Sequence, residues 1–223
     1  MSERMSRRGD ALAALATVRD PELDQPITEL GFVAGVRVTD SAVRAELRLP
    51  TYFCAPNFAW LMVADARDAL AARFDRVDVV LLEHFVSDEI NAGVAAVSDF
   101  GAAFGGDEDR ELAALRTTFE RKAHVAAQER LARALVGAGL DRGRLRSVTL
   151  EAAASLVPDA AAAVARRRDR LGIVSRYALC DDEGAALSEE GLPGWLRFAA
   201  TVRVSIEGNA GFCRGLLETR YGT

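Results

Sequence analysis

The stretch FVAGVRVTDSAVRAELRL, residues 32–49, decides the fold of the N-terminal part of the chain. Every second position of each half is apolar: Phe32, Ala34, Val36 and Val38, then Val43, Ala45, Leu47 and Leu49. This period of two is typical of strands that bury one face. The polar triplet Thr39-Asp40-Ser41 between the halves is a turn signal, so the stretch predicts a β-hairpin.

Helices flank this hairpin, and a third strand follows it. Asp10 is of a helix-capping type, and we expect a short helix from Asp10 to Val18. Pro56 suits the first turn of a helix, and apolar residues recur at helical spacing from there to Leu70. Residues 77–82 predict another strand. The order predicted for residues 1–86 is therefore α-β-β-α-β.

The chain becomes rich in alanine and in helical patterns from Ser87 onward. Helices are predicted from Ser87 to the Gly105-Gly106 pair, over residues 108–136, over 145–156 and over 158–171. The strand-like patterns at 174–180 and 198–206 predict a second hairpin, and residues 209–217 a terminal helix. The predicted fold class is α+β.

We expect two domains. The first, residues 1–86, is the small α-β-β-α-β unit. The second, residues 87–223, is a mostly helical extension that ends in a β-hairpin and a helix, and we expect it to bind a partner.

Composition excludes several classes of function. The chain has 28 basic against 33 acidic residues, a net charge of −5, which argues against a nonspecific nucleic-acid binder. It has no apolar run long enough for a membrane span and no signal-peptide pattern, so we expect a cytoplasmic protein that binds no membrane. The chain has two histidines and no hydrolase motif. An enzyme that acts on a small acyl or aromatic substrate is therefore the functional hypothesis that the sequence favours least.

Three widely spaced cysteines, Cys54, Cys180 and Cys213, form no CxxC pair. This spacing argues against a disulfide framework. It also argues against a zinc ribbon or a cluster held entirely by this chain, because such sites take four soft ligands.

Two sequence blocks and a cysteine carry a family resemblance. Arg19-Asp20-Pro21-Glu22-Leu23, then Ile27-Thr28-Glu29-Leu30-Gly31-Phe32-Val33, a hairpin, and Thr51 three residues before Cys54 resemble the iron–sulfur-assembly family that includes PaaD and SufT-like proteins. The family loop reads Thr-Pro-Gly-Cys-Pro, whereas Tyr52 and Phe53 precede the cysteine here, and the Cys-rich tail of PaaD-like proteins is absent.

The resemblance implies an accessory role in metallocofactor maturation and no turnover of a metabolite. The helical extension resembles accessory proteins of propane-type di-iron monooxygenases. The implied partner is a client metalloprotein such as a subunit of a di-iron monooxygenase, and a homodimer is also possible. The implied cofactor is iron or an iron–sulfur cluster, held transiently.

Cys54, Thr51, Asp20 and Glu22 are the candidate cofactor-binding residues. A thiol just before a helix start faces unpaired backbone N–H groups, which favour the thiolate that binds iron. Cys54 equally suits a small buried apolar position. Carboxylate oxygens of Asp20 and Glu22 could join a thiolate around iron, although an Asp before Pro is also a common turn former.

His84, Glu207 and Cys213 complete the candidate metal ligands around Cys54. His84 follows a predicted strand and lies beside acidic residues, which capping of the next helix explains equally well. Glu207 and Cys213 are six positions apart and would approach one centre only if the chain folds back between them; a helix cap at Asn209 is the alternative.

The sequence thus predicts an accessory factor that delivers iron or iron–sulfur species. The alternative is a metal-free adaptor or chaperone that stabilises an oxygenase subunit through protein contacts.

Overall fold

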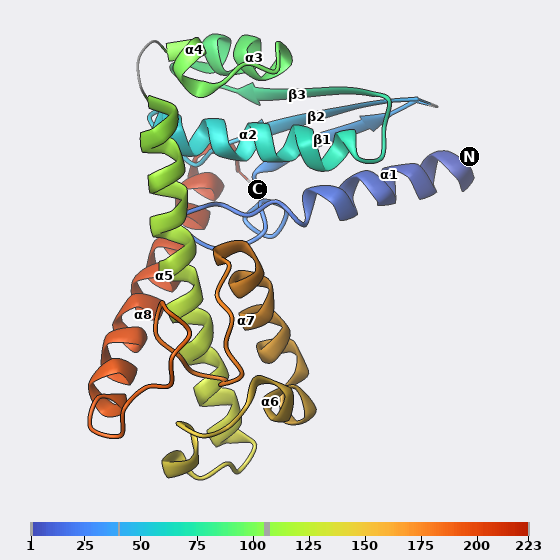
Figure 1. Ribbon diagram of the computed structural model, residues 1–223. Coiled ribbons are helices and arrows are strands. Elements are labelled where there is room, and N and C mark those ends of the chain that lie inside the picture. Colours follow the sequence, from blue (N-terminus) through green and yellow to red (C-terminus); the bar gives the residue numbers. More distant parts are fainter. Residues whose placement is uncertain (1, 40, 105–107, 223) are drawn as a thin grey trace. The chain divides into compact units, whose positions relative to one another are not determined.

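A computed structural model describes residues 2–39, 41–104 and 108–222 of the chain (Figure 1). The contacts group these residues into two compact units. The first unit comprises residues within 1–115 and 208–223, and the second comprises residues 116–207. Packing therefore joins residues 87–104, 108–115 and 208–222 to the N-terminal sheet, while the division into two domains at residue 86 stays a prediction.

The first unit contains the predicted α-β-β-α-β order and two further helices. Its elements are α1 (Ser2–Leu15), β1 (Val33–Val38), β2 (Ala42–Arg48), α2 (Pro56–Ala71), β3 (Arg76–Leu82), α3 (Ser87–Ala95) and α4 (Phe100–Phe104). The α+β fold class is confirmed. Helix α1 starts before Asp10, so Asp10 lies inside the helix and does not cap it; the Ser, Arg and Met residues ahead of it are compatible with helix. The predicted turn residue Asp40 and the predicted helix end at Gly105-Gly106 lie outside the described residues.

The three strands form one sheet in the order β1-β2-β3. β1 and β2 are antiparallel, with Val36 opposite Ala45, and β2 and β3 are parallel, with Ala45 opposite Val79. α1 and α2 pack against one face of this sheet and against each other (Figure 1). The buried core between them includes Leu15, Val43, Ala45, Leu47, Trp60, Val63, Leu70, Val79 and Leu81. The alternation that predicts β2 is thus the alternation of its buried face, at Val43, Ala45 and Leu47. In β1, Val36 is buried, but Ala34 is exposed at a register shift between Val33 and Gly35.

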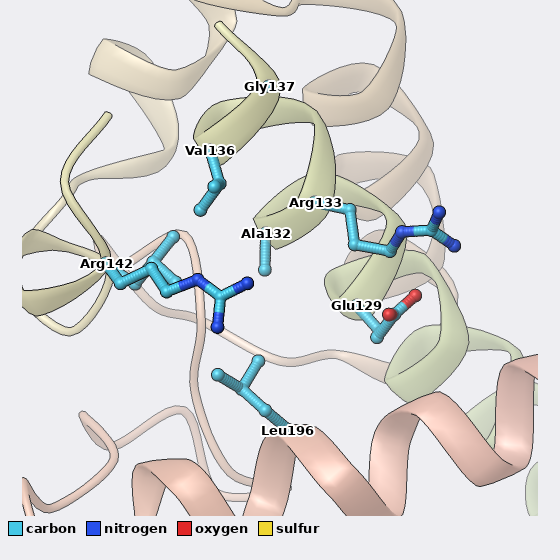
Figure 2. A pocket seen from close by; sticks show the side chains of 8 residues that line it. Glu129, Ala132, Arg133, Val136, Gly137, Arg142 and Leu196 are labelled. Atoms are coloured by element: carbon cyan, nitrogen blue, oxygen red, sulfur yellow. The ribbon is translucent and has the colours of Figure 1, made fainter. Parts of the chain in front are cut away.

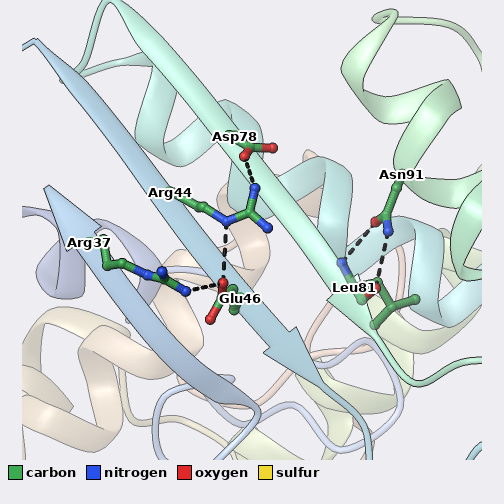
Figure 3. A network of polar contacts seen from close by, with 6 residues as sticks. All are labelled: Arg37, Arg44, Glu46, Asp78, Leu81 and Asn91. Carbon is green, nitrogen blue, oxygen red and sulfur yellow. Dashed lines mark hydrogen bonds and ion pairs between the residues drawn. The ribbon is translucent and has the colours of Figure 1, made fainter.

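The opposite face of the sheet carries a row of charged side chains (Figure 3). Arg44 on β2 forms ion pairs with Glu46 at 3.2 Å and with Asp78 on β3, and Arg37 on β1 pairs with Glu46 as well. Such exposed pairs contribute little to stability, about 0–1 kcal/mol each. They do mark this face as one that water covers.

The edge of β3 is satisfied by a side chain of α3. The Asn91 carboxamide accepts a hydrogen bond from the Leu81 N–H at 2.8 Å and donates one to the Leu81 carbonyl at 3.1 Å (Figure 3). The amide therefore takes the place of a neighbouring strand, which removes one free edge site.

The second unit is helical. It contains α5 (Glu108–Gly137) from Arg116 on, η1 (Arg142–Arg144), α6 (Leu150–Leu156), α7 (Pro158–Leu171) and α8 (Leu192–Tyr221) as far as Glu207. Thr149 caps α6 by accepting a hydrogen bond from the Ala152 N–H, and Gly172 ends α7 in the left-handed conformation. The buried core includes Leu131, Leu135, Leu145, Ala153, Val164 and Leu179. Within the described residues, no helix combines the length and the apolar character needed to cross a membrane.

A buried polar network holds the second unit together. Arg168 of α7 donates from Nε to His124 Nε2 at 3.2 Å and from its terminal nitrogens to the Tyr177 and Ala178 carbonyls at 2.7 and 3.0 Å. Burial and, to a smaller extent, the charges of Arg168 and Arg167 together lower the pKa of His124 to about 4. His124 is therefore a neutral hydrogen-bond acceptor that orients Arg168. Arg168 in turn holds the segment around Tyr177 and Ala178, which lies outside the helices and the sheet.

The predicted C-terminal β-hairpin is wrong. Residues 192–221 form one continuous helix, α8, and residues 174–180 make only isolated bridges, from Tyr177 to Thr149 and from Cys180 to Ala186. The residues that α8 buries recur at helical spacing: Leu192, Ala199, Ile206, Ala210 and Leu217. The alternation at 198–206 is misleading because Phe198 and Val204, two of its apolar residues, are exposed.

Candidate functional site

The predicted cysteine lies in the loop between β2 and α2. Cys54 is half-buried, and its Sγ lies 3.3 Å from the Thr51 hydroxyl oxygen. Pro56 begins α2 two residues later and Ala55 is its N-cap residue, without a side-chain hydrogen bond to the helix. The pairing of Thr51 with Cys54 is the contact that their spacing suggests.

His84 holds this loop from the far end of β3. The buried imidazole donates from Nε2 to the Cys54 carbonyl at 2.7 Å, and Nδ1 lies 3.5 Å from the Val86 N–H, which donates to it. Burial lowers the pKa of His84, the charge of Arg220 lowers it further, and the bond to Cys54 opposes both. The ring is therefore a neutral anchor with both nitrogens engaged. A role as metal ligand stays a prediction and requires the ring to release one of these contacts.

Asp20 organises the turn of the RDPEL block. Its Oδ1 accepts hydrogen bonds from the Glu22 N–H at 2.9 Å and the Leu23 N–H at 2.7 Å. Burial raises the pKa of Asp20 to about 6, and the two backbone bonds oppose this shift. The geometry is that of a turn former. It leaves the second carboxylate oxygen without a hydrogen bond to another described residue.

The last part of α8 packs on the same region of the first unit. Asn209 donates to the Glu22 carboxylate at 3.2 Å, and Arg214 donates to the Gln25 amide oxygen at 2.8 Å. Arg220 donates to the Leu49 carbonyl at 3.2 Å and to the Glu83 carbonyl at 2.8 Å. Asn209 lies inside α8 and is not a helix cap.

This docking brings Cys213 to the Cys54 region. Burial and, in decreasing order, the charges of Asp20, Cys54 and Glu22 together raise the pKa of the half-buried Cys213 thiol to about 11. Cys213 therefore lies within electrostatic reach of three other predicted site residues, Asp20, Cys54 and Glu22. The uncharged thiol is the stable form of Cys213 at neutral pH in the absence of a cation.

Glu207 belongs to the second unit and is already paired. Its carboxylate oxygens lie 3.2 Å from Arg130 Nε and 2.5 Å from a terminal nitrogen of Arg203. The fold-back that would bring Glu207 to Cys213 is not formed, because both residues lie on the continuous helix α8. Six helical positions separate them by about 9 Å along its axis.

The donor set is incomplete for a resident metal. Among the described residues, no three His, Cys, Asp or Glu side chains are arranged so that they could hold one ion. The remaining cysteine, Cys180, is buried in the second unit. Four-thiolate coordination by the first unit alone therefore does not fit these residues.

An exposed aromatic cluster next to Cys54 was not predicted as part of the site. Tyr52, Phe53 and Phe85 are 45, 77 and 44 % exposed, and their ring centroids lie 5.0 to 6.3 Å apart. The Phe85 N–H donates to the Tyr52 carbonyl at 3.2 Å, which joins the two loops. The sequence shows the three residues, but it does not show that residues 52–53 and 85 adjoin. Exposed apolar clusters of this kind mark protein-binding surfaces.

Comparison with protein families supports the resemblance seen in the sequence. Residues 8–80 match the family of iron–sulfur cluster assembly proteins. The matched segment contains Asp20, Glu22, Thr51 and Cys54, whereas His84, Glu207 and Cys213 lie outside it. Comparison with curated proteins and with solved structures gives no match. The match supports a role of the N-terminal segment in iron–sulfur cluster assembly or maturation.

Proposed function

We propose that this chain is a non-enzymatic accessory factor that holds iron or an iron–sulfur species as cargo and passes it to a client metalloprotein. The observation that carries the proposal is that two half-buried thiols, Cys54 and Cys213, pack against the same core, in a unit whose N-terminal segment matches iron–sulfur cluster assembly proteins. The charges of Cys54 and Asp20 both act on the Cys213 thiol.

The electrostatics of this region favour a cation. Burial raises the pKa of both Asp20 and Cys213, and neighbouring groups such as Glu22 raise both further. A bound cation would oppose these shifts and favour release of the protons. Thiolates are the preferred ligands of iron–sulfur species. The incomplete donor set supports a cargo that shares its ligands with a second protein rather than a permanent cofactor.

The finer parts of the proposal rest on the family resemblance and on the expectations drawn from composition. The client is a di-iron monooxygenase subunit, the transfer takes place in the cytoplasm, and a homodimer of this chain is one way to complete the ligands.

Metal content tests the proposal. Protein purified anaerobically is loaded with iron and sulfide, desalted, and examined by mass spectrometry for metals and by absorption spectroscopy. We expect near-stoichiometric iron in the wild type, and its loss in Cys54→Ser and Cys213→Ser.

The matched control is Cys180→Ser, which removes the thiol that lies buried in the second unit. It should load as the wild type does. Iron that is absent from all four proteins, or equal in all four, would refute the cargo role of Cys54 and Cys213.

A second candidate function is a metal-free adaptor, and the exposed aromatic cluster favours it. In that case the rings of Tyr52, Phe53 and Phe85 bind the client directly, and Cys54 is dispensable. Co-expression with a di-iron monooxygenase hydroxylase separates the two functions. An adaptor predicts that Cys54→Ser still supports iron-loaded hydroxylase whereas Phe53→Ser does not.

A further inference from the structure

Two adjoining hollows lie on the surface of the second unit. One, of about 420 Å³, is bordered by the end of α5, and the other, of about 530 Å³, by the start of α8. Both are lined by Arg142 and Leu196, so they form one continuous depression, which we call the basic groove. Figure 2 shows its first half.

The floor of the basic groove is apolar. It is formed by Ala132, Val136, Leu145 and Leu196 in the first half and by Leu192, Pro193 and Ala200 in the second. A surface of this kind binds apolar side chains that alternate with polar ones, as on one face of an amphipathic segment.

The rim of the basic groove carries unneutralised positive charge. Arg133, Arg142 and Arg197 are exposed, and their guanidinium groups make no hydrogen bond or ion pair with another described residue. In Figure 2 the guanidinium of Arg142 projects over the apolar floor beside Leu196.

The acidic residues of the lining do not cancel this charge. Glu129 is bound by Arg203 at 2.5 Å, and Glu189 lies 3.9 Å from a further arginine of the rim, Arg146. A positive rim is thus concentrated around an apolar floor in a chain whose net charge is −5.

We propose that the basic groove binds an acidic amphipathic segment of a partner protein. Leucine-type side chains of the segment fill the two hollows, and its carboxylates pair with Arg133, Arg142 and Arg197. A nucleic acid fits less well because it offers no apolar side chains for the floor, and the net negative charge of the chain repels a long polyanion. This recognition needs no iron and goes beyond the proposed function.

Fluorescence anisotropy tests the groove with a defined probe. The probe is a fluorescein-labelled peptide that repeats Leu-Glu-Glu-Leu-Leu-Glu-Asp twice, titrated with the full-length protein. We expect saturable binding that Arg142→Glu and Arg197→Glu each weaken about tenfold, and that weakens as salt screens the charges. A peptide with Gln in place of every acidic residue should bind at least about tenfold more weakly.

The matched control is Arg166→Glu. Arg166 is an exposed arginine of α7 in the same unit, makes no ion pair with another described residue, and lies outside the lining of the groove. Arg142→Gln removes the positive charge without adding a negative one, so its affinity for the acidic peptide should lie between those of the wild type and Arg142→Glu. Circular dichroism checks that each variant is folded.

Three results would overturn the proposal: no saturable binding of the acidic peptide, equal loss of affinity in Arg166→Glu, or equal binding of the Gln peptide. Tighter binding of a single-stranded oligonucleotide than of the acidic peptide would also overturn it, in favour of a nucleic-acid site.

Discussion

At the scale of single residues, one imidazole fixes the position of the candidate cargo-binding thiol. His84 is buried, and its Nε2–H donates to the Cys54 carbonyl at 2.7 Å. His84→Ala removes this donor, so the loop opens more often. We expect iodoacetamide to alkylate Cys54 several-fold faster in His84→Ala than in the wild type, as measured by mass spectrometry of tryptic peptides.

Two comparisons isolate this effect. His84→Gln keeps an N–H donor and should give an intermediate rate. Cys180 reports on global unfolding because it is buried in the other unit. Faster alkylation of Cys180 as well would mean that the substitution unfolds the protein, and an unchanged rate at Cys54 would mean that His84 does not anchor the loop.

A second imidazole makes stability depend on pH. His124 has a pKa of about 4 in the folded chain because it is buried beside Arg168 and Arg167. In the unfolded chain its pKa returns to about 6.5. Between these values the unfolded chain binds the proton and the folded chain does not, so stability falls as the pH drops from about 6.5 to about 4, by at most about 3 kcal/mol.

Urea unfolding at pH 7 and pH 5 measures this dependence. His124→Gln keeps an acceptor for the Arg168 N–H but cannot be protonated, so the loss of stability between the two pH values should shrink. The chain has two histidines, and the other, His84, is present in both proteins, so the difference reports on His124. An equal pH dependence in the two proteins would refute the assignment.

At the scale of elements, two helical glycines predict opposite effects of the same substitution. A Cβ on Gly93 of α3 would lie 2.6 Å from the Trp60 ring of α2, whereas a Cβ on Gly211 of α8 would meet nothing within 4 Å. Gly93→Ala should therefore destabilise the protein by about 1–3 kcal/mol through overpacking. Gly211→Ala should stabilise it by about 1 kcal/mol because alanine favours helix.

Thermal and urea unfolding of the two alanine variants check this pair. If Gly211→Ala destabilises the protein, α8 is not helical at this position in solution. If Gly93→Ala is neutral, the close packing of α3 on Trp60 is absent.

Helix α8 also shows why a sequence pattern can predict the wrong secondary structure. The N-terminal hairpin is predictable because its second strand buries one face throughout, at Val43, Ala45 and Leu47. Residues 198–206 show a similar alternation and many β-branched side chains, yet they are helical. Their burial follows a stripe set by helix packing, and packing overrides intrinsic strand propensity.

At the scale of the whole molecule, the candidate site is only partly predictable for the same reason. Asp20, Glu22, Thr51 and Cys54 lie in recognisable blocks of the matched segment. The nearness of Cys213 to them depends on where the end of α8 packs, and no local pattern encodes that. The aromatic cluster is a second example, because it needs two loops that α2 and β3 separate in sequence.

The incomplete donor set leads to a prediction about assembly that rests on the proposed cargo role. One chain supplies two thiols, Cys54 and Cys213, to the candidate site, whereas an iron–sulfur cluster takes about four thiolate ligands. Two copies would supply all of them. We expect sedimentation velocity to show a dimer after anaerobic loading with iron and sulfide, and a return to the smaller species after addition of a chelator.

The cysteine variants distinguish this assembly from simple self-association through the exposed rings. Cys54→Ser and Cys213→Ser should stay in the smaller form after loading, whereas Cys180→Ser should dimerise as the wild type does. Phe53→Ser tests self-association through the aromatic cluster, because Phe53 is the most exposed ring of that cluster. A dimer that forms without iron and disappears in this variant is held by the aromatic cluster. Near-stoichiometric iron bound to a single copy would refute the shared site, because one chain would then supply every protein ligand that the cargo needs.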